Sequence, residues 1–566
     1  MKKITSIVLF VVTLQTLHAQ NLDQGRKFLY YQRYISAKAQ FEKLLASNPN
    51  NIDAVYWLGQ TLIGQKDSLA AKDVYQKALA SNGNAPLLLA GIGQIELMEN
   101  KTNEARQRFE TAISLSKSKD INVLNAVGRA NVYAVLGDAN YAVEKINSVA
   151  SEKKDPRNAD SYLIVGEAYR KLIDGGAAVT NFQKALSLDP KLAEAKYRIA
   201  KVYQSQNNPD YFIPAYQEAI TLDPNYAPAY NELFTYYFLR DINKSKEYFD
   251  KYLAVTDPKP SDDYDRISLL FAARNYQAAV DSAKGKITQL ADKADPRYYK
   301  LVAYSYDELK DSVNAKTFLD QYFTKQTKEA FVPQDYVFRA KILSKFPGSE
   351  ADALASYQTA VDLDTSMVTK LELMSEAAAF AGKAGNRAEE ANWLAKLYKT
   401  KKDPSNRDLY DWGYANYMAG NYLTADSIFC GVYSQKYPTE VFGYLWCAKS
   451  ASAQDTTMEK GLGVEPYKKL IAFADTAKEK YKATLLTAHS YLAGYYANVA
   501  KDKDSAVAQL KSVLELDPAN ADAQKYIDIL LKPAPAPKQA STAKTGTATK
   551  TGKAKPAAKK PAAKKK

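Results

Sequence analysis

The stretch Ala159–Pro190 reads ADSYLIVGEAYRKLIDGGAAVTNFQKALSLDP, and it contains the whole pattern from which the fold can be predicted. In its first half, Tyr162 lies four residues before Gly166 and Tyr169 lies three residues after it. Spacings of three and four place residues on one side of a helix. This half therefore predicts a short helix whose packed face has a small residue at its centre.

The second half of the stretch has the same spacings, but here two small residues flank a large one. Ala178 and Ala185 lie four residues before and three residues after Phe182. Asp189-Pro190 then ends the pattern, because proline disfavours a helical conformation in the residue before it. We therefore predict two short helices folded back on each other, with small residues at their closest approach and an aromatic ring filling the gap beside them.

The position of Gly166 recurs along the chain at intervals that are mostly close to 34 residues. The fourteen recurring positions are Gly25, Gly59, Gly93, Gly128, Gly166, Ala200, Phe234, Ser268, Ala303, Ala340, Ala379, Gly413, Cys447 and Gly494. We call these positions anchors. One helix pair cannot cover its own apolar face, so successive pairs must stack around a continuous core.

This pattern resembles the tetratricopeptide repeat family over nearly the whole chain. The units that resemble it most closely are those around Gly59, Gly93, Gly166, Ala200 and Gly494, and the units that depart from it most are those around Ser268, Ala340, Ala379 and Cys447. The resemblance implies an all-α fold, a right-handed superhelical solenoid of about fourteen antiparallel helix pairs.

The chain divides into five expected regions. They are a signal peptide (1–19), a regular half of the array (20–260), a more degenerate half (261–531) with an insertion near 453–465 and a capping helix at 522–531, and a disordered tail (532–566) rich in lysine, alanine and proline. We expect the insertion to form an exposed loop.

The first twenty residues have the organisation of a secretory signal peptide. Lys2 and Lys3 precede the apolar run Ile4–Leu17, and a small residue, Ala19, precedes Gln20. The run is shorter than the roughly 20 residues that span a bilayer, although an uncleaved anchor helix is the alternative. No cysteine follows the expected cleavage near Ala19/Gln20, so a lipoprotein is not expected. We predict an exported, periplasmic protein.

The net charge of +14 is concentrated at the C-terminus, where Lys532–Lys566 contains eleven lysines and no acid. Without this tail and the signal peptide the chain is close to neutral, which argues against nucleic acid as a partner, as export does. The candidate polyanion-binding residues are Lys553, Lys555, Lys559, Lys560, Lys564, Lys565 and Lys566. They would attract anionic lipid, lipopolysaccharide or peptidoglycan, and the alternative is a solubilising linker without a partner.

In the family that the chain resembles, the first helices of successive pairs line a concave groove that binds peptides or partner helices. The resemblance implies that the groove residues are Tyr56, Gln60, Gln94, Leu163, Glu167, Arg170, Tyr197, Lys201, Asn231, Thr235 and Phe238. The alternative is that each is an ordinary solvated or edge-packing position. The sequence does not predict the oligomeric state.

The sequence contains few of the residues on which enzyme active sites and metal sites depend. Beyond the signal peptide, His489 is the only histidine, so no catalytic set, metal site or cofactor is expected. The two cysteines, Cys430 and Cys447, lie on neighbouring predicted helices. A disulfide is one alternative in an oxidising compartment, but two unrelated buried thiols are the favoured interpretation.

The sequence therefore predicts a non-enzymatic periplasmic scaffold or adaptor that binds envelope proteins. Its overall character is similar to exported tetratricopeptide proteins of Bacteroidota, a group that includes components of secretion, outer-membrane assembly and energy-coupling machinery. The alternative is a peptidoglycan- or glycan-binding envelope protein that uses aromatic residues of the concave face together with the basic tail.

Overall fold

The computed structural model describes residues 22–151 and 154–532, and over these residues it is helical, with only an isolated bridge between Ser151 and Lys154. The described chain forms two compact units, Met1–Lys328 (unit 1) and Glu329–Lys566 (unit 2). The predicted signal peptide and the candidate lysines of the tail lie outside the described residues.

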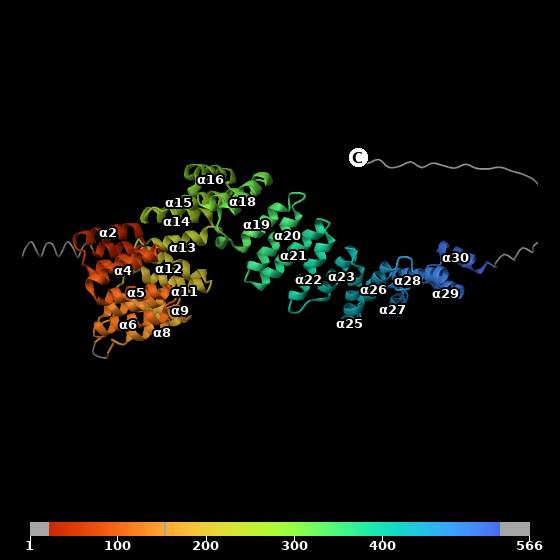
Figure 1. The fold of residues 1–566 in the computed structure, drawn as a ribbon, viewed down its shortest axis with the longest axis horizontal. Helices are drawn as coiled ribbons and strands as arrows, with labels where there is room; N and C mark the ends of the chain where they lie inside the picture. The colour runs from red at the N-terminus through yellow and green to blue at the C-terminus, as the bar shows by residue number, and fades with distance from the viewer. Residues whose placement is uncertain (1–21, 152–153, 533–566) are drawn as a thin grey trace, which may run out of the picture. The chain divides into compact units, whose positions relative to one another are not determined.

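Unit 1 begins with a helix over residues 22–30 and continues through regular helix pairs (Figure 1). Its further elements are α2 (Tyr34–Ser47), α3 (Ile52–Gly64), α4 (Ser68–Asn82), α5 (Pro86–Met98), α6 (Thr102–Leu115), α7 (Ile121–Tyr133), α8 (Ala139–Asn147), α9 (Ala159–Lys171), α10 (Gly175–Leu188), α11 (Ala193–Ser205), α12 (Pro209–Leu222), α13 (Ala227–Tyr237), α14 (Ile242–Val255), α15 (Ser261–Ala272), α16 (Tyr276–Leu290), η1 (Ala291–Lys293), α17 (Pro296–Glu308) and α18 (Ser312–Lys325).

A short 3-10 turn, η2 (Lys328–Ala330), spans the boundary between the two units. The elements of unit 2 are α19 (Pro333–Leu343), α20 (Glu350–Leu363), α21 (Met367–Lys383), α22 (Arg387–Thr400), α23 (Asn406–Met418), α24 (Tyr422–Asp426), η3 (Ser427–Tyr433), α25 (Ser434–Lys436), α26 (Val441–Gln454), α27 (Val464–Ala474), η4 (Asp475–Ala477), α28 (Lys482–Tyr495), η5 (Tyr496–Ala500), α29 (Lys503–Leu516) and α30 (Ala521–Leu531).

The predicted fold class is confirmed, because every anchor lies in the first helix of a pair within the described residues. Gly166 lies in α9, which packs against α10, and the stop Asp189-Pro190 follows α10 directly. The expected capping helix is α30.

The anchor glycines explain how the two helices of a pair approach each other. A Cβ atom on Gly59 would lie 2.1 Å from the ring of Tyr75, and one on Gly166 would lie 2.4 Å from the ring of Phe182. No real Cβ tolerates such contacts, so the small residue is what lets the aromatic ring of the second helix lie flat against the first helix. Tyr75 and Phe182 are both fully buried as a result.

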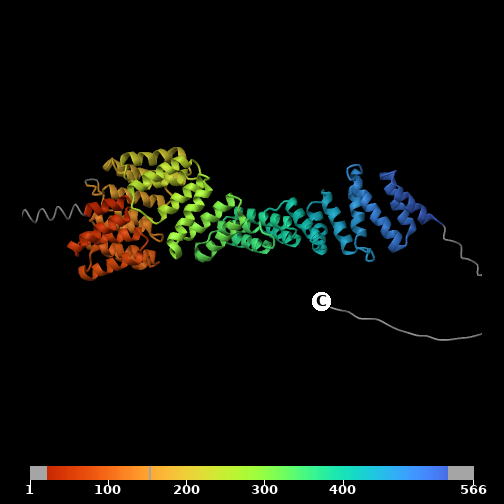
Figure 2. The same cartoon turned by 90° about the horizontal axis from the view of Figure 1, so that it is seen from above.

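Unit 1 closes on itself, which the repeat pattern alone does not indicate. The first helix pair lies beside α12–α14 (Figure 2). The hydroxyl of Tyr31 donates to Asp223 at 2.8 Å, and Tyr30 accepts a hydrogen bond from the backbone N–H of Glu194 at 3.2 Å. The ring of Tyr30 also packs 5.0 Å from that of Tyr226.

The buried carboxylate of Asp257, which follows α14, completes this closure. It accepts hydrogen bonds from the backbone N–H of Ser36 at 2.9 Å and from the Ser36 hydroxyl at 2.6 Å. It also forms an ion pair with Nε of Arg33 at 3.1 Å. Ser36 lies in the first turn of α2, where backbone N–H groups lack helical partners, so Asp257 caps α2 from a distant part of the chain. We call these contacts the Asp257 closure.

The boundary between the compact units is separate from the expected change in repeat regularity. The compact units meet at Lys328–Glu329, and the division into a regular half (20–260) and a degenerate half (261–531) stays a prediction. Within each unit, pairs with irregular anchors still pack on their neighbours, as α16 does on α17 in unit 1 and α20 does on α21 in unit 2. The insertion between α26 and α27 has exposed residues, but its ends are held in place: Asp455 is buried and accepts from the backbone N–H of Leu462.

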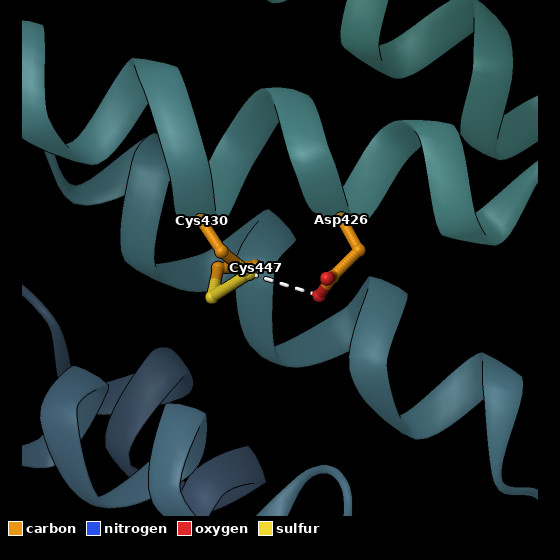
Figure 3. A group of neighbouring side chains, drawn as sticks. All are labelled: Asp426, Cys430 and Cys447. Atoms are coloured by element: carbon orange, nitrogen blue, oxygen red, sulfur yellow. Dashed lines mark hydrogen bonds between the residues drawn. A yellow bond between two sulfur atoms is a disulfide. The ribbon is translucent and has the colours of Figure 1, made fainter.

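The favoured interpretation of two separate thiols is wrong, because Cys430 and Cys447 form a disulfide (Figure 3). Cys430 lies in the π-helical turn η3 and Cys447 lies in α26, and the two Cα atoms are 4.8 Å apart. That distance falls within the range that a disulfide bridges without backbone movement. The sequence places the cysteines on neighbouring helices but does not show how the helical turns face each other.

Candidate functional site

The inner face of unit 1 surrounds a cavity of about 600 Å³. First helices supply most of its wall, as expected for the concave side of such an array, and the helix over residues 22–30 forms one side of it. The lining residues are Asp23, Arg26, Lys27, Leu29, Tyr30, Gln32, Tyr34, Trp57, Gln60, Ile63, Gly64, Gln94, Arg129, Tyr133, Ala159, Asp160, Leu163, Leu192, Glu194, Arg198 and Tyr226. We call this space the unit 1 cavity.

One side of the cavity is organised around the largely buried guanidinium of Arg129. Its Nη2 donates to both carboxylate oxygens of Asp160, at 2.8 and 2.7 Å. The same guanidinium lies 5.3 Å from the ring centre of Trp57, and that of Arg26 lies 5.0 Å from it. Burial alone would lower the pKa of Arg129, but the attraction of Asp160 outweighs it and holds the pKa above its usual range.

The opposite side contains a chain of four alternating charges. Arg198 donates to Glu194 through Nε at 3.0 Å, and its Nη1 lies 2.7 Å from Glu167. Glu167 also accepts two hydrogen bonds from Arg170. Burial of Glu167 would raise its pKa, but the two arginines more than offset this, so the pKa of Glu167 lies below its usual range. The group is therefore ionised at neutral pH, and its charge is fully matched inside the protein.

Between these two sides, α3 and α5 contribute a pair of amides at equivalent positions. Nε2 of Gln60 donates to Oε1 of Gln94 at 2.7 Å and to the hydroxyl of Tyr75 at 3.1 Å. These bonds use both hydrogens of the Gln60 amide nitrogen. They fix the orientation of the Gln94 side chain and leave its own amide nitrogen available on the cavity wall.

The predicted groove residues of α3 to α9 gather at or just behind this cavity. Gln60, Gln94 and Leu163 line it, whereas Glu167 is buried beneath its surface and Tyr56 is buried in α3. Burial raises the pKa of Tyr56 to about 12. Arg170 is half-exposed and is held by Glu167. Whether any of these residues contacts a partner stays a prediction.

The predicted groove residues of α11 and α13 do not reach the cavity. Tyr197 and Lys201 both bind the carboxylate of Glu232, at 3.2 and 3.0 Å. Asn231 and Thr235 are exposed on α13. Phe238, the residue that follows α13, packs edge-on against Phe234 with ring centres 6.0 Å apart, in an apolar cluster of that pair. These five residues therefore lie apart from the group around Gln60.

The sequence reasoning missed Arg129, Arg198, Trp57 and the cations of the first helix. A signal for Arg129 was present, because it directly follows an anchor, as Gln60 and Gln94 do. The residue after the anchor points to the inner face in each of these three units. The contribution of the first helix had no local signal, since it depends on closure of the array.

A second surface of unit 1 was also missed. Two adjacent turns between helices carry exposed aliphatic side chains: Val135 and Leu136 between α7 and α8, and Leu172 and Ile173 between α9 and α10. Val135 is 91% exposed and Ile173 is 93% exposed. Nζ of Lys171 ties the turns together, because it donates to the carbonyls of residues 131, 134 and 137 at 2.6–3.0 Å. We call these four aliphatic residues the turn patch.

Ile173 in this patch has an unusual backbone conformation, with φ of 63°. Equivalent turns in neighbouring units place Lys66, Asn100 or Asn207 at the left-handed position. Asparagine tolerates this region, whereas a β-branched side chain there is strained. Strain of this kind is retained where a side chain serves a purpose other than stability.

The part of the chain that the structure describes holds one group of side chains with metal-ligand chemistry in close proximity, formed by Asp426, Cys430 and Cys447. Sγ of Cys430 lies 2.9 Å from a carboxylate oxygen of Asp426 (Figure 3). Metals bind the thiolate form of cysteine, and the disulfide engages both sulfur atoms. We therefore interpret this group as a covalent link between two helical segments and not as a metal site.

Comparisons with known proteins agree with the repeat pattern. Sequence profiles for the tetratricopeptide repeat match residues 22–86, 159–192 and 193–226. The C-terminal part of a TPR repeat-containing protein from Cytophaga hutchinsonii is 30% identical, and the match covers 48% of this chain and 99% of that one, with a TM-score of 0.29. No curated protein matches the chain.

Two further solved structures are similar at lower identity. Yeast Tom70 is 16% identical over 79% of this chain and 97% of its own, with a TM-score of 0.32. PilW, a widely conserved type IV pilus biogenesis factor, is 17% identical over 44% of this chain and 94% of its own, with a TM-score of 0.27.

The chain belongs to the tetratricopeptide repeat family, on the basis of the repeat profiles and the 30% identity to almost the whole of the Cytophaga fragment. These repeats imply a scaffold role in protein–protein interaction. Among the described helices, none is both long enough and apolar enough to cross a membrane.

Proposed function

We propose that this protein is an exported scaffold of the cell envelope, and that it binds protein partners through the turn patch of unit 1. The observation that carries the proposal is the juxtaposition of Val135 and Ile173, two almost fully exposed aliphatic side chains on adjacent turns. Single exposed apolar residues are ordinary, but four exposed aliphatic side chains on two linked turns are more typical of a protein-binding site. Lys171, the last residue of α9, links the two turns because its side chain donates to three carbonyls at the end of α7 and in the turn that follows it.

The periplasmic location and the role of the tail are parts of the same proposal. They are supported by the sequence of residues 1–20, which has the organisation of a signal peptide, and by the eleven lysines of Lys532–Lys566. In an envelope, such a tail would hold the protein near anionic surfaces through a salt-sensitive attraction. The tail would then raise the concentration of the protein near its partners, while the specificity for a partner would come from the turn patch.

Affinity capture from envelope extracts tests the protein-binding role. The full chain is compared with V135D/I173D and with a variant lacking residues 532–566. L423D is the matched control, because Leu423 is 70% exposed on a helix of unit 2. We expect a protein captured by the full chain and by L423D to be lost from V135D/I173D, because a buried interface does not accept unpaired carboxylates. Equal capture by V135D/I173D would refute the role of the patch.

Two additional measurements test the location and the tail. Fractionation of cells that express the full chain should place it in the periplasm, and removal of residues 1–19 should leave it in the cytoplasm. Sedimentation with anionic vesicles should depend on the tail and fall as salt rises. Binding that survives tail deletion unchanged would contradict an electrostatic role for the tail.

No observation favours the glycan-binding alternative. Trp57, the tryptophan that lines the unit 1 cavity, has the guanidinium groups of Arg26 and Arg129 about 5 Å from its ring centre, which leaves less of the ring for stacking on a sugar. That the chain is not an enzyme stays a prediction.

A further inference from the structure

The geometry points to the unit 1 cavity as a binding site for a small organic acid, a free carboxylate carried on an apolar body of a few carbon atoms to one aromatic ring system. This inference goes beyond the protein-binding role, since it concerns a different surface and a different class of ligand. It rests on the charge, the donors and the size of the cavity.

The charge argument starts from the cations of the cavity wall. Arg129 and Arg198 are matched by Asp160 and Glu194, so these four residues leave no excess charge. The helix over residues 22–30 adds Arg26 and Lys27.

These two cations are not neutralised in the same way. Arg26 lies 3.9 Å from Asp23, whose side chain is 76% exposed, so this pair contributes little. Among the described residues, Lys27 makes no ion pair and only approaches the ring of Tyr31, at 5.8 Å. With Asp23 counted against Arg26 and Lys27, an anion in the cavity meets an excess of one positive charge on the helix over residues 22–30. Both cations are exposed, so this attraction depends on the salt concentration.

The wall also supplies a neutral donor and an apolar surface. The bond from Gln60 holds the amide of Gln94 in one orientation, so that its nitrogen can donate to a carboxylate oxygen without an ordering cost. Leu29, Ile63 and Leu163 provide apolar contacts on the same wall. Polar groups at a few points of a mainly apolar wall are what orient a small molecule in a pocket.

The size argument comes from closure. A cavity of about 600 Å³ lies within the usual range of about 300–1,000 Å³ for small-molecule sites. The contacts of the first helix pair with Glu194, Asp223 and Asp257 narrow the inner face, whereas an extended peptide would need it open along several units. The partly open cavity is therefore better matched to a compact ligand than to an extended protein segment.

Binding of defined probes to the purified full chain tests the inference. The probes are hexanoate, 4-phenylbutyrate and indole-3-acetate, each paired with its uncharged amide, and affinities are measured by isothermal titration calorimetry. We expect at least one carboxylate to bind saturably at one site, and its amide to bind at least about tenfold more weakly, since hydrogen bonds to charged groups are the stronger ones.

Two variants locate the site. R26A/K27A removes the cations of the helix over residues 22–30, and K117A/K119A removes two exposed lysines of a turn outside the cavity as the matched control. Q94E keeps an acceptor for Gln60 but places a negative charge on the wall, where it would repel the carboxylate of the probe. It therefore tests the site even if R26A/K27A loosens the first helix. We expect about tenfold weaker binding in R26A/K27A, loss of binding in Q94E and no change in the control.

Several results would overturn the inference. They are no binding by any carboxylate, equal binding of acids and amides, or binding that Q94E leaves intact. Binding of a ten-residue peptide through its C-terminal carboxylate, with no binding of the free acids, would also overturn it, because the occupant would then be a protein end. None of these outcomes depends on the turn patch, so failure here and failure of the scaffold proposal are distinguishable.

Discussion

Replacement of Asp257 by alanine should open unit 1 between its first helix pair and α14 while leaving the helix pairs themselves folded. The carboxylate is 5% exposed at the residue level and receives three interactions, from the Ser36 N–H, the Ser36 hydroxyl and Arg33. Its loss leaves the N–H of Ser36 without a cap and Arg33 without its ion-pair partner, although Arg33 keeps its contacts with Ser36 and Phe28.

The magnitude follows from the burial of each partner. Breaking a fully buried ion pair costs about 3–5 kcal/mol, but the Arg33 side chain is 34% exposed, so water recovers part of that loss. One charge-assisted hydrogen bond at a helix start is worth about 1.5–3 kcal/mol. We therefore expect D257A to reduce the free energy of opening the first pair by about 2 kcal/mol, which corresponds to a roughly 30-fold loss of protection.

Amide hydrogen exchange followed by mass spectrometry measures this local opening. Peptides from residues 22–47 should exchange faster in D257A, and peptides from α5 and α6 should change little, because opening is confined to the contact that was broken. The control is D250A, which removes an exposed carboxylate from α14. Unchanged exchange over residues 22–47 in D257A would refute the reasoning, as would an equal effect of D250A.

The closure should also depend on pH in one direction. Burial alone would raise the pKa of Asp257, but hydrogen bonds from Ser36 and the pair with Arg33 outweigh it, so the pKa is lowered. A group with a lowered pKa stabilises the folded state above its unfolded pKa, about 3.9, and loses that contribution as the pH falls. Exchange over residues 22–47 should therefore rise below about pH 4 in the wild type and rise less in D257A.

Three further predictions concern stability. G59A should destabilise unit 1 by about 2 kcal/mol or more, because the new Cβ would lie 2.1 Å from the buried ring of Tyr75. G285A, whose new Cβ would have nothing within 4 Å, should instead stabilise the protein by up to about 1 kcal/mol. Thermal unfolding of the two variants compares these effects. I173N should raise stability by about 1 kcal/mol by removing strain at φ of 63°, while weakening capture of the partner; an unchanged or lower midpoint would contradict the strain. Reduction of the Cys430–Cys447 disulfide, whose cysteines are 17 residues apart, should lower the free energy of unfolding in urea by about 3 kcal/mol. The unfolding of C430S/C447S should not change when a reducing agent is added.

The repeat could be predicted because the contacts that define it are local. Gly166 meets Phe182 only 16 positions later, and the same pairing links Gly59 to Tyr75. Size and spacing of nearby residues are written directly in the sequence, and Asp189-Pro190 marks where the second helix ends. The candidate groove came instead from the resemblance to the family, and of its residues Gln60, Gln94 and Leu163 line the unit 1 cavity.

The groove could not be followed further, because its geometry depends on accumulated rotation from pair to pair. Tyr197 and Lys201 occupy positions like those of earlier units, yet Glu232 of the next pair binds both. The 34-residue repeat pattern does not reveal that Glu232, two helices further along, binds these side chains. The strained Ile173 and its exposed neighbours were missed for a related reason, since exposure depends on which turns end up side by side.

The helix pairs, their number and their stops can be read from the amino-acid sequence, because each depends on residues within one repeat. The contact between the two ends of unit 1, the cavity inside it and the bond between Cys430 and Cys447 emerge only when the repeats are stacked. Closure joins Ser36 to Asp257 across 221 positions, and the disulfide needs two Cα atoms 4.8 Å apart. Such contacts follow from how every intervening pair is rotated on the last, and no single repeat contains that information.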